Sequence, residues 1–545
     1  MKRLWRILLI LSSSFLFTLV QPNEALVSGF LPAAFLALVP YLLAIRSAPS
    51  RREAALLGAL FGFTSHAATS YWLMFFEDYA IWTIGSTSIA YALLHLLIAS
   101  FIYHFSTRSN AVCPRAQPFF STRRILALAA TWTVWEFLKS IGFLGYPWGI
   151  LAVSFHRFPL LIQTADTFGI WGMGFFIITV NAFIAELVMA RKAPVRELRS
   201  FGLFVLAMAV YIPAYGAFRL IAPTETVDSA RLVLVQANAD SWTYGNEESV
   251  IASSQRLTRE GLTRFGEKTS ERGTKNRADL VVWSETLLNR SYVHSKRRYS
   301  SIPQGDPFIP FLKEIGIPLL TGAPHILTID PITAVNAAIL LAPDGAVQSI
   351  YGKQHPVPFA EYIPFFEIPA VREFMQKNVG LQSTWSLGTE SVIMEIPLAS
   401  GRPLRFGVPI CFENAFADVC RGFVARGADL LINITNVSWS RQVSMQTQHL
   451  AIARFRSVET RRGMVQATNS GVSTFIDAEG RQHETLPYFQ EGVLSLEIPI
   501  QLSRGPTLYL LLGDWLPILL ALLLFISLIR DYFRRPPAAG SLSID

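Results

Sequence analysis

Long apolar runs constrain the fold of this chain more than any other feature of its sequence. A helix needs roughly 20 mostly apolar residues to cross the hydrocarbon core of a bilayer. Eight such runs occur, seven of them before residue 222 and the eighth near the end of the chain. They span about residues 4–20, 25–45, 55–76, 80–105, 125–145, 160–190, 201–221 and 507–529. We therefore predict a multi-span α-helical membrane bundle of eight transmembrane helices, with a water-exposed domain between the last two.

The composition agrees with a membrane protein. Of the 545 residues 51% are hydrophobic and only 16% charged, and the mean hydropathy is +0.36. The first run follows Lys2, Arg3 and Arg6 but precedes no clear cleavage site, so we interpret it as a retained anchor. The net charge of +8 is concentrated in short clusters beside the apolar runs. This pattern indicates membrane topology and argues against nucleic-acid binding.

Basic residues fall in alternate loops between these runs. The intervening loops hold Glu24, Glu77 and Asp78, with Arg157 against them. The basic clusters are Lys2/Arg3/Arg6, Arg46/Arg51/Arg52, Arg108/Arg115/Arg123/Arg124, Arg191/Lys192/Arg196/Arg199 and Arg530/Arg534/Arg535. Because Lys- and Arg-rich loops stay in the cytoplasm, both termini are predicted to be cytoplasmic. In a bacterial inner membrane, the domain between them would then face the periplasm.

The predicted division of the chain follows from this topology. A seven-helix transmembrane bundle covers residues 1–221, an extracytoplasmic domain covers 222–506, and a final helix with a short cytoplasmic tail covers 507–545. Within the bundle, Glu136 and Lys139 are either a functional pair or a plain intrahelical ion pair. Trp132, Trp135 and Trp148 are interpreted as an interfacial belt.

From residue 229 onward, short β-prone runs alternate with amphipathic helical stretches, which is the pattern of an α/β domain. Strands that are almost entirely apolar, such as 430–434, predict a sheet covered on both faces. The run 404–411 is predicted to be a strand that ends at Cys411. A strand ending in a thiol can hold a nucleophile where substrate reaches it, although a free cysteine is more often a small buried hydrophobe.

Three polar residues stand where predicted strands end: Glu285, Lys353 and Cys411. Together they supply the groups for acyl transfer. The carboxylate takes the thiol proton, the thiolate attacks a carbonyl, and the ammonium with the N–H of Phe412 stabilises the oxyanion. Glu361 and Glu413 are further candidates for orienting the lysine or stabilising the oxyanion. Each of the three also has a plain structural interpretation: Glu285 as a helix cap, Lys353 as a solvated lysine and Cys411 as a core thiol.

The cysteines and the ligand-type residues show no spacing typical of a structural metal. Cys113, Cys411 and Cys420 are an odd number, which argues against a disulfide framework. A Cys411–Cys420 disulfide remains an alternative in an oxidising compartment, although it would consume the nucleophile. We predict no metal and no cofactor.

These motifs resemble the Glu-Lys-Cys triad of the nitrilase superfamily. The second motif and the helix layout are similar to the apolipoprotein N-acyltransferase family in particular, and this resemblance covers the whole chain. The stretches that carry it are 283–286, 351–353, 358–364, 410–413, 435–439, 448–454 and 468–473. The resemblance implies a nitrilase-like αββα sandwich domain with Glu285, Lys353 and Cys411 as catalytic residues.

The resemblance also implies a two-step reaction on lipids. On this interpretation Cys411 takes an acyl chain from the sn-1 position of phosphatidylethanolamine and passes it to the amine of a diacylglyceryl-cysteine apolipoprotein. Glu285 would act as base and acid, with Trp439 and Trp242 among the supporting residues. Residues 359–385 are a candidate lid, or else a packed aromatic loop. The protein is expected to work as a monomer in the bilayer.

The sequence departs from the family pattern at four positions beside the motifs. Ser284 stands where the family usually has proline, Ala360 where it has glycine, and Val437 and Ser440 where it has aspartate and phenylalanine. None of these removes a member of the triad, so they bear on substrate preference. Two rival functions are a membrane-bound nitrilase-type amidase and a non-catalytic lipoprotein-binding scaffold.

Overall fold

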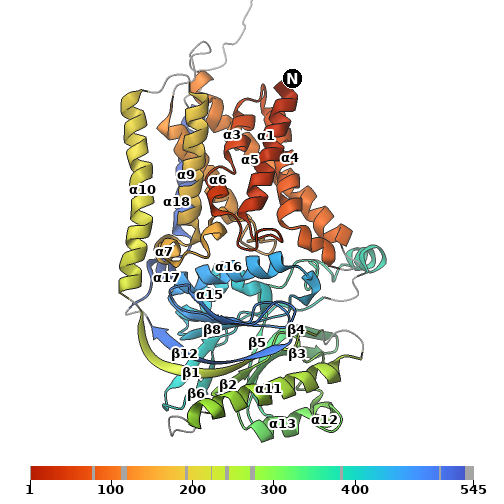
Figure 1. Cartoon of the computed structure of the whole chain (residues 1–545). Coiled ribbons are helices and arrows are strands. Elements are labelled where there is room, and N and C mark those ends of the chain that lie inside the picture. Colours follow the sequence, from red (N-terminus) through yellow and green to blue (C-terminus); the bar gives the residue numbers. More distant parts are fainter. Residues whose placement is uncertain are drawn as a thin grey trace, which may run out of the picture.

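The computed structural model in Figure 1 describes residues 2–76, 80–111, 120–190, 194–222, 224–239, 245–270, 277–380, 384–502 and 505–533. A bundle of helices stands on an α/β domain, and α1 begins at the end of the bundle that lies away from this domain. The chain passes into the domain through α10 (Val195–Ile221) and leaves it through α17 (Leu508–Leu512) and α18 (Trp515–Phe533).

Five helices in the described part of the chain are long and apolar enough to cross a membrane. They are α1 (Lys2–Val20), α5 (Ser86–Ala111) with the π-helical turn before it, α9 (Ile170–Met189), α10 and α18. The prediction of eight such helices is therefore confirmed for five of the eight runs.

The remaining three runs contain helices that are shorter or more polar than the sequence suggested. Run 25–45 forms two pieces, α2 (Leu31–Ala34) and α3 (Val39–Arg46), and each has a proline, which lacks an N–H, as its second residue. Run 55–76 lies largely in α4 (Arg51–Thr69), and run 125–145 in α6 (Thr122–Leu138), which has only 17 residues. Run 160–190 is also interrupted, since α7 (Pro159–Ile162) and α8 (Ala165–Phe168) precede α9.

Basic residues from successive predicted cytoplasmic loops converge in the bundle. Arg124 and Arg46 both pair with the buried carboxylate of Glu186, at 2.8 and 2.5 Å. Arg6 pairs with Glu53 at 2.7 Å. These ion pairs place the loops before α4 and before α6 beside the end of α9.

Two interpretations of the bundle residues are corrected by the structure. Glu136 and Lys139, both described, form no ion pair with each other. Oε1 of Glu136 accepts from Trp132 Nε1 and Leu151 N, and Lys139 Nζ donates to the carbonyl of Trp148. Trp132, Trp135 and Trp148 are not an interfacial belt, since all three are at most 5% exposed.

The described residues of the domain form two six-stranded sheets. The first has the order β12-β1-β2-β3-β4-β5 and the second β11-β10-β9-β8-β7-β6. In each, parallel pairs lie at the centre and antiparallel pairs at the edges. The strands of the first sheet are β1 (Glu225–Gln236), β2 (Leu280–Val282), β3 (Leu319–Ile329), β4 (Ile332–Leu341), β5 (Val347–Gly352) and β12 (Gly492–Leu502). Those of the second are β6 (Met394–Pro397), β7 (Pro403–Gly407), β8 (Leu430–Thr435), β9 (Gly463–Thr468), β10 (Thr474–Ile476) and β11 (Gln482–Thr485).

Helices cover the outer face of each sheet, which confirms the predicted two-sheet nitrilase-like sandwich. α11 (Glu247–Ser270), α12 (Lys296–Tyr299) and α13 (Phe308–Ile315) lie on the side away from the bundle. α15 (Ala417–Ala425) and α16 (Val443–Thr460) lie between the second sheet and the bundle. The mostly apolar strand β8 is fully buried for this reason, as its sequence predicted.

One hydrophobic core runs from the bundle into the sandwich, whereas a second lies between the first sheet and its outer helices. The junction is also held by buried ion pairs. Arg461, at the end of α16 and 1% exposed, pairs with Asp166 of α8 at 2.6 Å. The bundle and the α15–α16 layer are therefore packed as one unit.

Candidate active site

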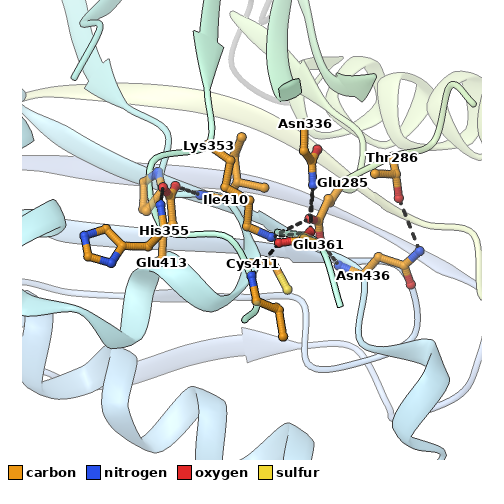
Figure 2. A network of polar contacts seen from close by, with 12 residues as sticks. Glu285, Thr286, Asn336, Lys353, His355, Glu361, Ile410, Cys411, Glu413 and Asn436 are labelled. Atoms are coloured by element: carbon orange, nitrogen blue, oxygen red, sulfur yellow. Dashed lines mark hydrogen bonds and ion pairs between the residues drawn. The ribbon is translucent and has the colours of Figure 1, made fainter. Parts of the chain in front are cut away.

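Three segments of the sandwich bring Glu285, Lys353 and Cys411 to one place. Glu285 lies shortly after β2, Lys353 follows β5 directly, and Cys411 opens the short 3₁₀ helix η6 (Cys411–Ala415). Figure 2 shows the Cys411 sulfur beside the cluster formed by Lys353, Glu285 and Glu361. Glu285 and Lys353 are 68 positions apart in the sequence, and Lys353 and Cys411 are 58 apart, so only the fold joins them.

The predicted strand 404–411 is shorter than expected. β7 ends at Gly407, and of the following residues Ile410 forms only an isolated bridge to Ile434. Cys411 itself has φ +50°, a left-handed conformation that is uncommon for a residue with a side chain. The thiol therefore sits on a tight turn between strand and helix, and not at the end of a regular strand.

Lys353 lies between two carboxylates. Its Nζ is 2.8 Å from Oε1 of Glu361 and 3.2 Å from Oε1 of Glu285. The lysine is 1% exposed. Burial alone would lower the pKa of Lys353, but the charges of Glu285 and Glu361 together raise it above its usual value. The lysine is thus a permanent cation at this position, which suits it to stabilising negative charge.

Asn336 and Asn436 hold the carboxylate of Glu285 from two sides. Asn336 Nδ2 donates to Oε1 of Glu285 at 2.9 Å and to Oε1 of Glu361 at 3.1 Å, while the backbone N–H of Asn436 donates to Oε2 of Glu285 at 2.8 Å (Figure 2). Sequence reasoning missed Asn336. The available signal was a buried amide in the otherwise apolar strand β4, since buried polar groups need partners.

The backbone of Cys411 is fixed by two donors. Its carbonyl oxygen accepts from Asn433 Nδ2 at 3.1 Å and lies 3.1 Å from His449 Nε2. Burial lowers the pKa of His449 to about 4, so this ring is neutral and donates its Nε2 proton. Sequence reasoning did not assign either role, although the stretch containing His449 was among the family motifs.

The Cys411 thiol is buried, with 8% of the residue exposed. Burial, followed by the negative charge of Glu285, raises its pKa to about 12, while Lys353 acts in the opposite direction. At neutral pH the resting group is therefore a thiol, and it needs a base to become a nucleophile. Cys411 and Cys420 are both free, so the alternative of a disulfide between them is not present in the structure.

Glu413 binds backbone and tyrosine donors and does not contact Lys353. Its carboxylate accepts from the N–H groups of Gln354, His355 and Ile410 at 2.6, 3.0 and 2.7 Å, and from the hydroxyl of Tyr351 at 2.9 Å. It thereby ties the segment after Lys353 to the turn before Cys411. Of the two roles predicted for the glutamates, contact with the lysine belongs to Glu361.

The other predicted supporting residues lie towards the bundle or outside the described residues. The ring of Phe412 stacks on Trp148 of the bundle, and Trp439 contacts Trp72 with ring centroids 5.8 Å apart. Trp242 lies outside the described residues. Within the segment 359–385, α14 (Pro369–Phe374) and the π-helical turn η5 (Met375–Val379) lie near the bundle, with Phe359, Phe365 and Phe374 more than half exposed.

Comparison with known proteins links this geometry to a family. The model "Apolipoprotein N-acyltransferase N-terminal domain" matches residues 13–183, and the model "Carbon-nitrogen hydrolase" matches residues 249–505. Apolipoprotein N-acyltransferase 2 of Treponema denticola is 35% identical over 540 residues, which are 97% of this chain and 98% of that protein. The chain belongs to the apolipoprotein N-acyltransferase family.

Other apolipoprotein N-acyltransferases match over similar lengths. Apolipoprotein N-acyltransferase 2 of Treponema pallidum is 33% identical and matches 95% of this chain and 94% of its own length. The apolipoprotein N-acyltransferase of Borreliella burgdorferi is 28% identical and matches 96% of this chain and 95% of its own length. The N-terminal family model falls on the bundle helices α1 to α9, and the carbon-nitrogen hydrolase model includes Glu285, Lys353 and Cys411. The likeness to apolipoprotein N-acyltransferases therefore extends over both parts of the chain.

Proposed function

We propose that this protein transfers an acyl chain from a membrane phospholipid, through a thioester on Cys411, to the N-terminal amine of diacylglyceryl-cysteine in apolipoproteins. This would be the last step of bacterial lipoprotein maturation. The observation that carries the proposal is the buried cluster of Glu285, Lys353 and Glu361 beside the Cys411 thiol, in a chain of this family. Glu285, Lys353 and Cys411 form its Glu-Lys-Cys triad.

In the first half-reaction Glu285 takes the proton of Cys411 Sγ. The thiolate attacks the ester carbonyl carbon of the phospholipid, and the resulting oxyanion is stabilised by Lys353 Nζ and the N–H of Phe412. Phe412 is the second residue of η6, and the first N–H groups of a helix have no partner within it. The C–O bond then breaks, the alkoxide takes the proton from Glu285, and a lysophospholipid leaves.

In the second half-reaction the amine of diacylglyceryl-cysteine attacks the thioester carbonyl. Glu285 accepts a proton from this nitrogen, the C–S bond breaks, and the proton returns to the sulfur. The same two groups stabilise the second oxyanion. The hydrogen bonds from Asn336 and Asn436 keep the carboxylate of Glu285 in one place through both steps.

The membrane arrangement of the enzyme is part of the proposal. Eight segments cross the bacterial inner membrane, seven within 1–221 and one within 507–545, with both termini cytoplasmic and the domain 222–506 in the periplasm. Its α15–α16 layer then faces the outer leaflet, where both lipid substrates reside. Phosphatidylethanolamine is the proposed donor, the monomer the proposed working state, and residues 359–385 the proposed lid.

Mass spectrometry after exposure to phosphatidylethanolamine tests the function. We expect a mass increase of one acyl chain on the peptide containing Cys411, with release of an equimolar amount of lysophospholipid. Cys411→Ala should insert into membranes but form no acyl-enzyme. N-acylation of a diacylglyceryl peptide by Cys411→Ala at the wild-type rate would overturn the assignment. Hydrolysis of amides without lysophospholipid would favour a nitrilase-type amidase, and absence of both reactions would favour a non-catalytic scaffold.

A further inference from the structure

A second feature of the junction between bundle and domain is unused by this mechanism. It is a cavity of about 250 Å³ lined by α6, α9 and α18 of the bundle and by η6, α15 and α16 of the domain. Its lining includes neither Glu285, Lys353 nor Cys411. Protein interiors contain few voids larger than a water molecule, so a space of this size at a bilayer surface calls for an occupant.

The bundle side of this cavity is apolar and continuous with the lipid-facing surface. Phe137, Ile170 and Ile518 contribute to it. Ile518 is 49% exposed, and Leu522 and Phe525 further along α18 are more than half exposed. An acyl chain can therefore enter between the helices from the side that faces lipid.

A cation without a partner stands on the domain side. Arg421 of α15 makes no hydrogen bond and no ion pair with any residue in the described part of the chain. Its guanidinium lies against Gly513, the bend between α17 and α18, where a Cβ would overlap Nη1 of Arg421. Gly513 also has φ +61°, so the backbone favours glycine there.

The other charged groups of the lining are already engaged. Oδ1 of Asp514 accepts from Trp171 Nε1 and from the hydroxyl of Tyr509, both at 2.6 Å. Arg456 pairs with Glu459 at 2.8 Å. Asp418 lies 3.5 Å from His355 Nε2. Arg421, whose charge also acts on the buried carboxylate of Glu459, is thus the cation of this lining that forms no hydrogen bond or ion pair with the described residues.

We propose that this cavity is a second phospholipid-binding site, in which Arg421 binds the phosphate and the apolar wall formed by α6, α9 and α18 binds an acyl chain. A planar guanidinium matches the geometry of a phosphate. The bend at Gly513 holds the guanidinium of Arg421 at the level of the lipid headgroups. Because Ala415 of η6 also lines the cavity, the bound lipid contacts the helix that begins with Cys411. The lipid is a resident of the junction and not the acyl donor, since the lining excludes the triad.

Photo-crosslinking of the full chain in a phosphate-free detergent tests this site. The probe is phosphatidylethanolamine with a diazirine in one acyl chain, and the protein carries Cys411→Ala so that the probe is not consumed. We expect crosslinks at Phe137, Ile452 and Ile518. Arg421→Gln should lower their yield about tenfold, because hydrogen bonds to charged groups are the stronger ones. Arg426→Gln, at the end of the same helix, where its guanidinium binds the Ser391 carbonyl, is the matched control and should change nothing.

A diacylglycerol probe with the same photoreactive chain separates headgroup from chain. The diacylglycerol probe should crosslink more weakly, and its yield should not change in Arg421→Gln. Ile518→Trp fills the cavity from its exposed side and should lower the crosslinking yield of both probes. Equal yields from wild type and Arg421→Gln, equal losses of both probes in Arg421→Gln, or no crosslinks at these residues would each overturn the site. Crosslinking at these residues, together with no acyl group on Cys411 of the wild-type chain after exposure to phosphatidylethanolamine, would overturn only the proposed function, so the two failures are distinguishable.

Discussion

The indole ring of Trp148 stacks on the phenyl ring of Phe412, with centroids 5.1 Å apart and planes inclined by 11°. Trp148 belongs to the bundle, whereas Phe412 follows Cys411 directly. The same indole is nearly parallel to the ring of His449, whose Nε2 donates to the Cys411 carbonyl. Lys139 in turn holds the carbonyl of Trp148. The membrane part of the protein therefore contacts the nucleophile's immediate neighbours.

Trp148→Leu is expected to slow acylation of Cys411 about tenfold, because an aromatic pair contributes roughly 0.5–1.5 kcal/mol beyond its buried area. Trp148→Phe should recover most of the rate, since it retains a stacked ring. The measurement is the rate of acyl-enzyme formation by mass spectrometry, with thermal unfolding as a check on folding. If Trp148→Leu acylates at the wild-type rate, the stack does not position Phe412.

Glu285→Gln should lower acyl-enzyme formation by a factor of about 10²–10⁴, the usual contribution of a positioned general base. Glutamine can still accept from the N–H of Asn436, so the protein should fold. The comparison variant is Glu361→Gln, which also loses a charge beside Lys353 but leaves the proposed base in place. A larger defect in Glu361→Gln than in Glu285→Gln would assign the base to Glu361.

Lys353→Met is expected to destabilise the domain by about 3–5 kcal/mol, because it leaves two buried carboxylates without their cation. Adding Glu361→Gln removes one of these charges and should recover part of the lost stability, but no activity. Urea unfolding of the purified protein measures the first effect and lysophospholipid release the second. If Lys353→Met were as stable as the wild type, the carboxylates of Glu285 and Glu361 would be hydrated and would not depend on pairing with Lys353.

Alkylation of Cys411 by iodoacetamide should depend steeply on pH. Because its pKa is raised to about 12, the thiolate fraction is small at pH 7 and rises about tenfold per pH unit up to pH 10, without the plateau of an ordinary thiol. Glu285→Gln removes a charge that raises this pKa, so it should speed alkylation while it stops acyl transfer. Peptide mapping separates Cys411 from Cys420, which is fully buried and should not react. A plateau near pH 8 would contradict the raised pKa.

Glu413→Gln should reduce both stability and acylation. The backbone N–H groups now donate to both carboxylate oxygens of Glu413, and the amide nitrogen of glutamine cannot accept from them. Each buried donor left unsatisfied costs about 1–3 kcal/mol. Tyr351→Phe removes only one hydroxyl from the same carboxylate and should cost about 1 kcal/mol with nearly normal acylation. Thermal unfolding and the acylation assay are compared for the two variants. Loss of acylation in Glu413→Gln without loss of stability would instead indicate a direct role in the reaction.

Much of the domain could be predicted from local patterns. The strand β8 lies where an almost entirely apolar run predicted it, and strands alternate with helices from residue 229 onward as the sequence pattern predicted. The end of β7 could not be predicted, since residues 408–410 are as apolar as the strand before them. What stops the strand is the turn at Cys411, which is fixed by Asn433 and His449 from other segments and by Glu413 of η6 itself.

The bundle illustrates the same limit. The length of the apolar runs predicted where chain segments enter the lipid. The helices α3, α4 and α6 are nevertheless shorter than their runs, because the runs also contain prolines and polar residues whose hydrogen bonds only neighbouring helices can provide. Glu136 and Lys139 have the spacing of an intrahelical ion pair, yet each binds the loop 148–151 instead. Sequence spacing shows which groups can meet on one helix and not which of them a folded loop will reach first.

By itself the sequence determined that this chain has apolar segments for a membrane, an α/β domain between the last two, and the residues Glu285, Lys353 and Cys411 in the order of a known family, because these are properties of local composition and motif. The tertiary structure alone decided that Glu361 and Asn336 complete the cluster around Lys353 and that Trp148 of the bundle rests on Phe412. It also decided that Arg421, which pairs with none of the described residues, lies at a cavity with one apolar wall. Contacts of this kind join segments tens to hundreds of residues apart, and their geometry exists only once both sheets and the bundle have packed.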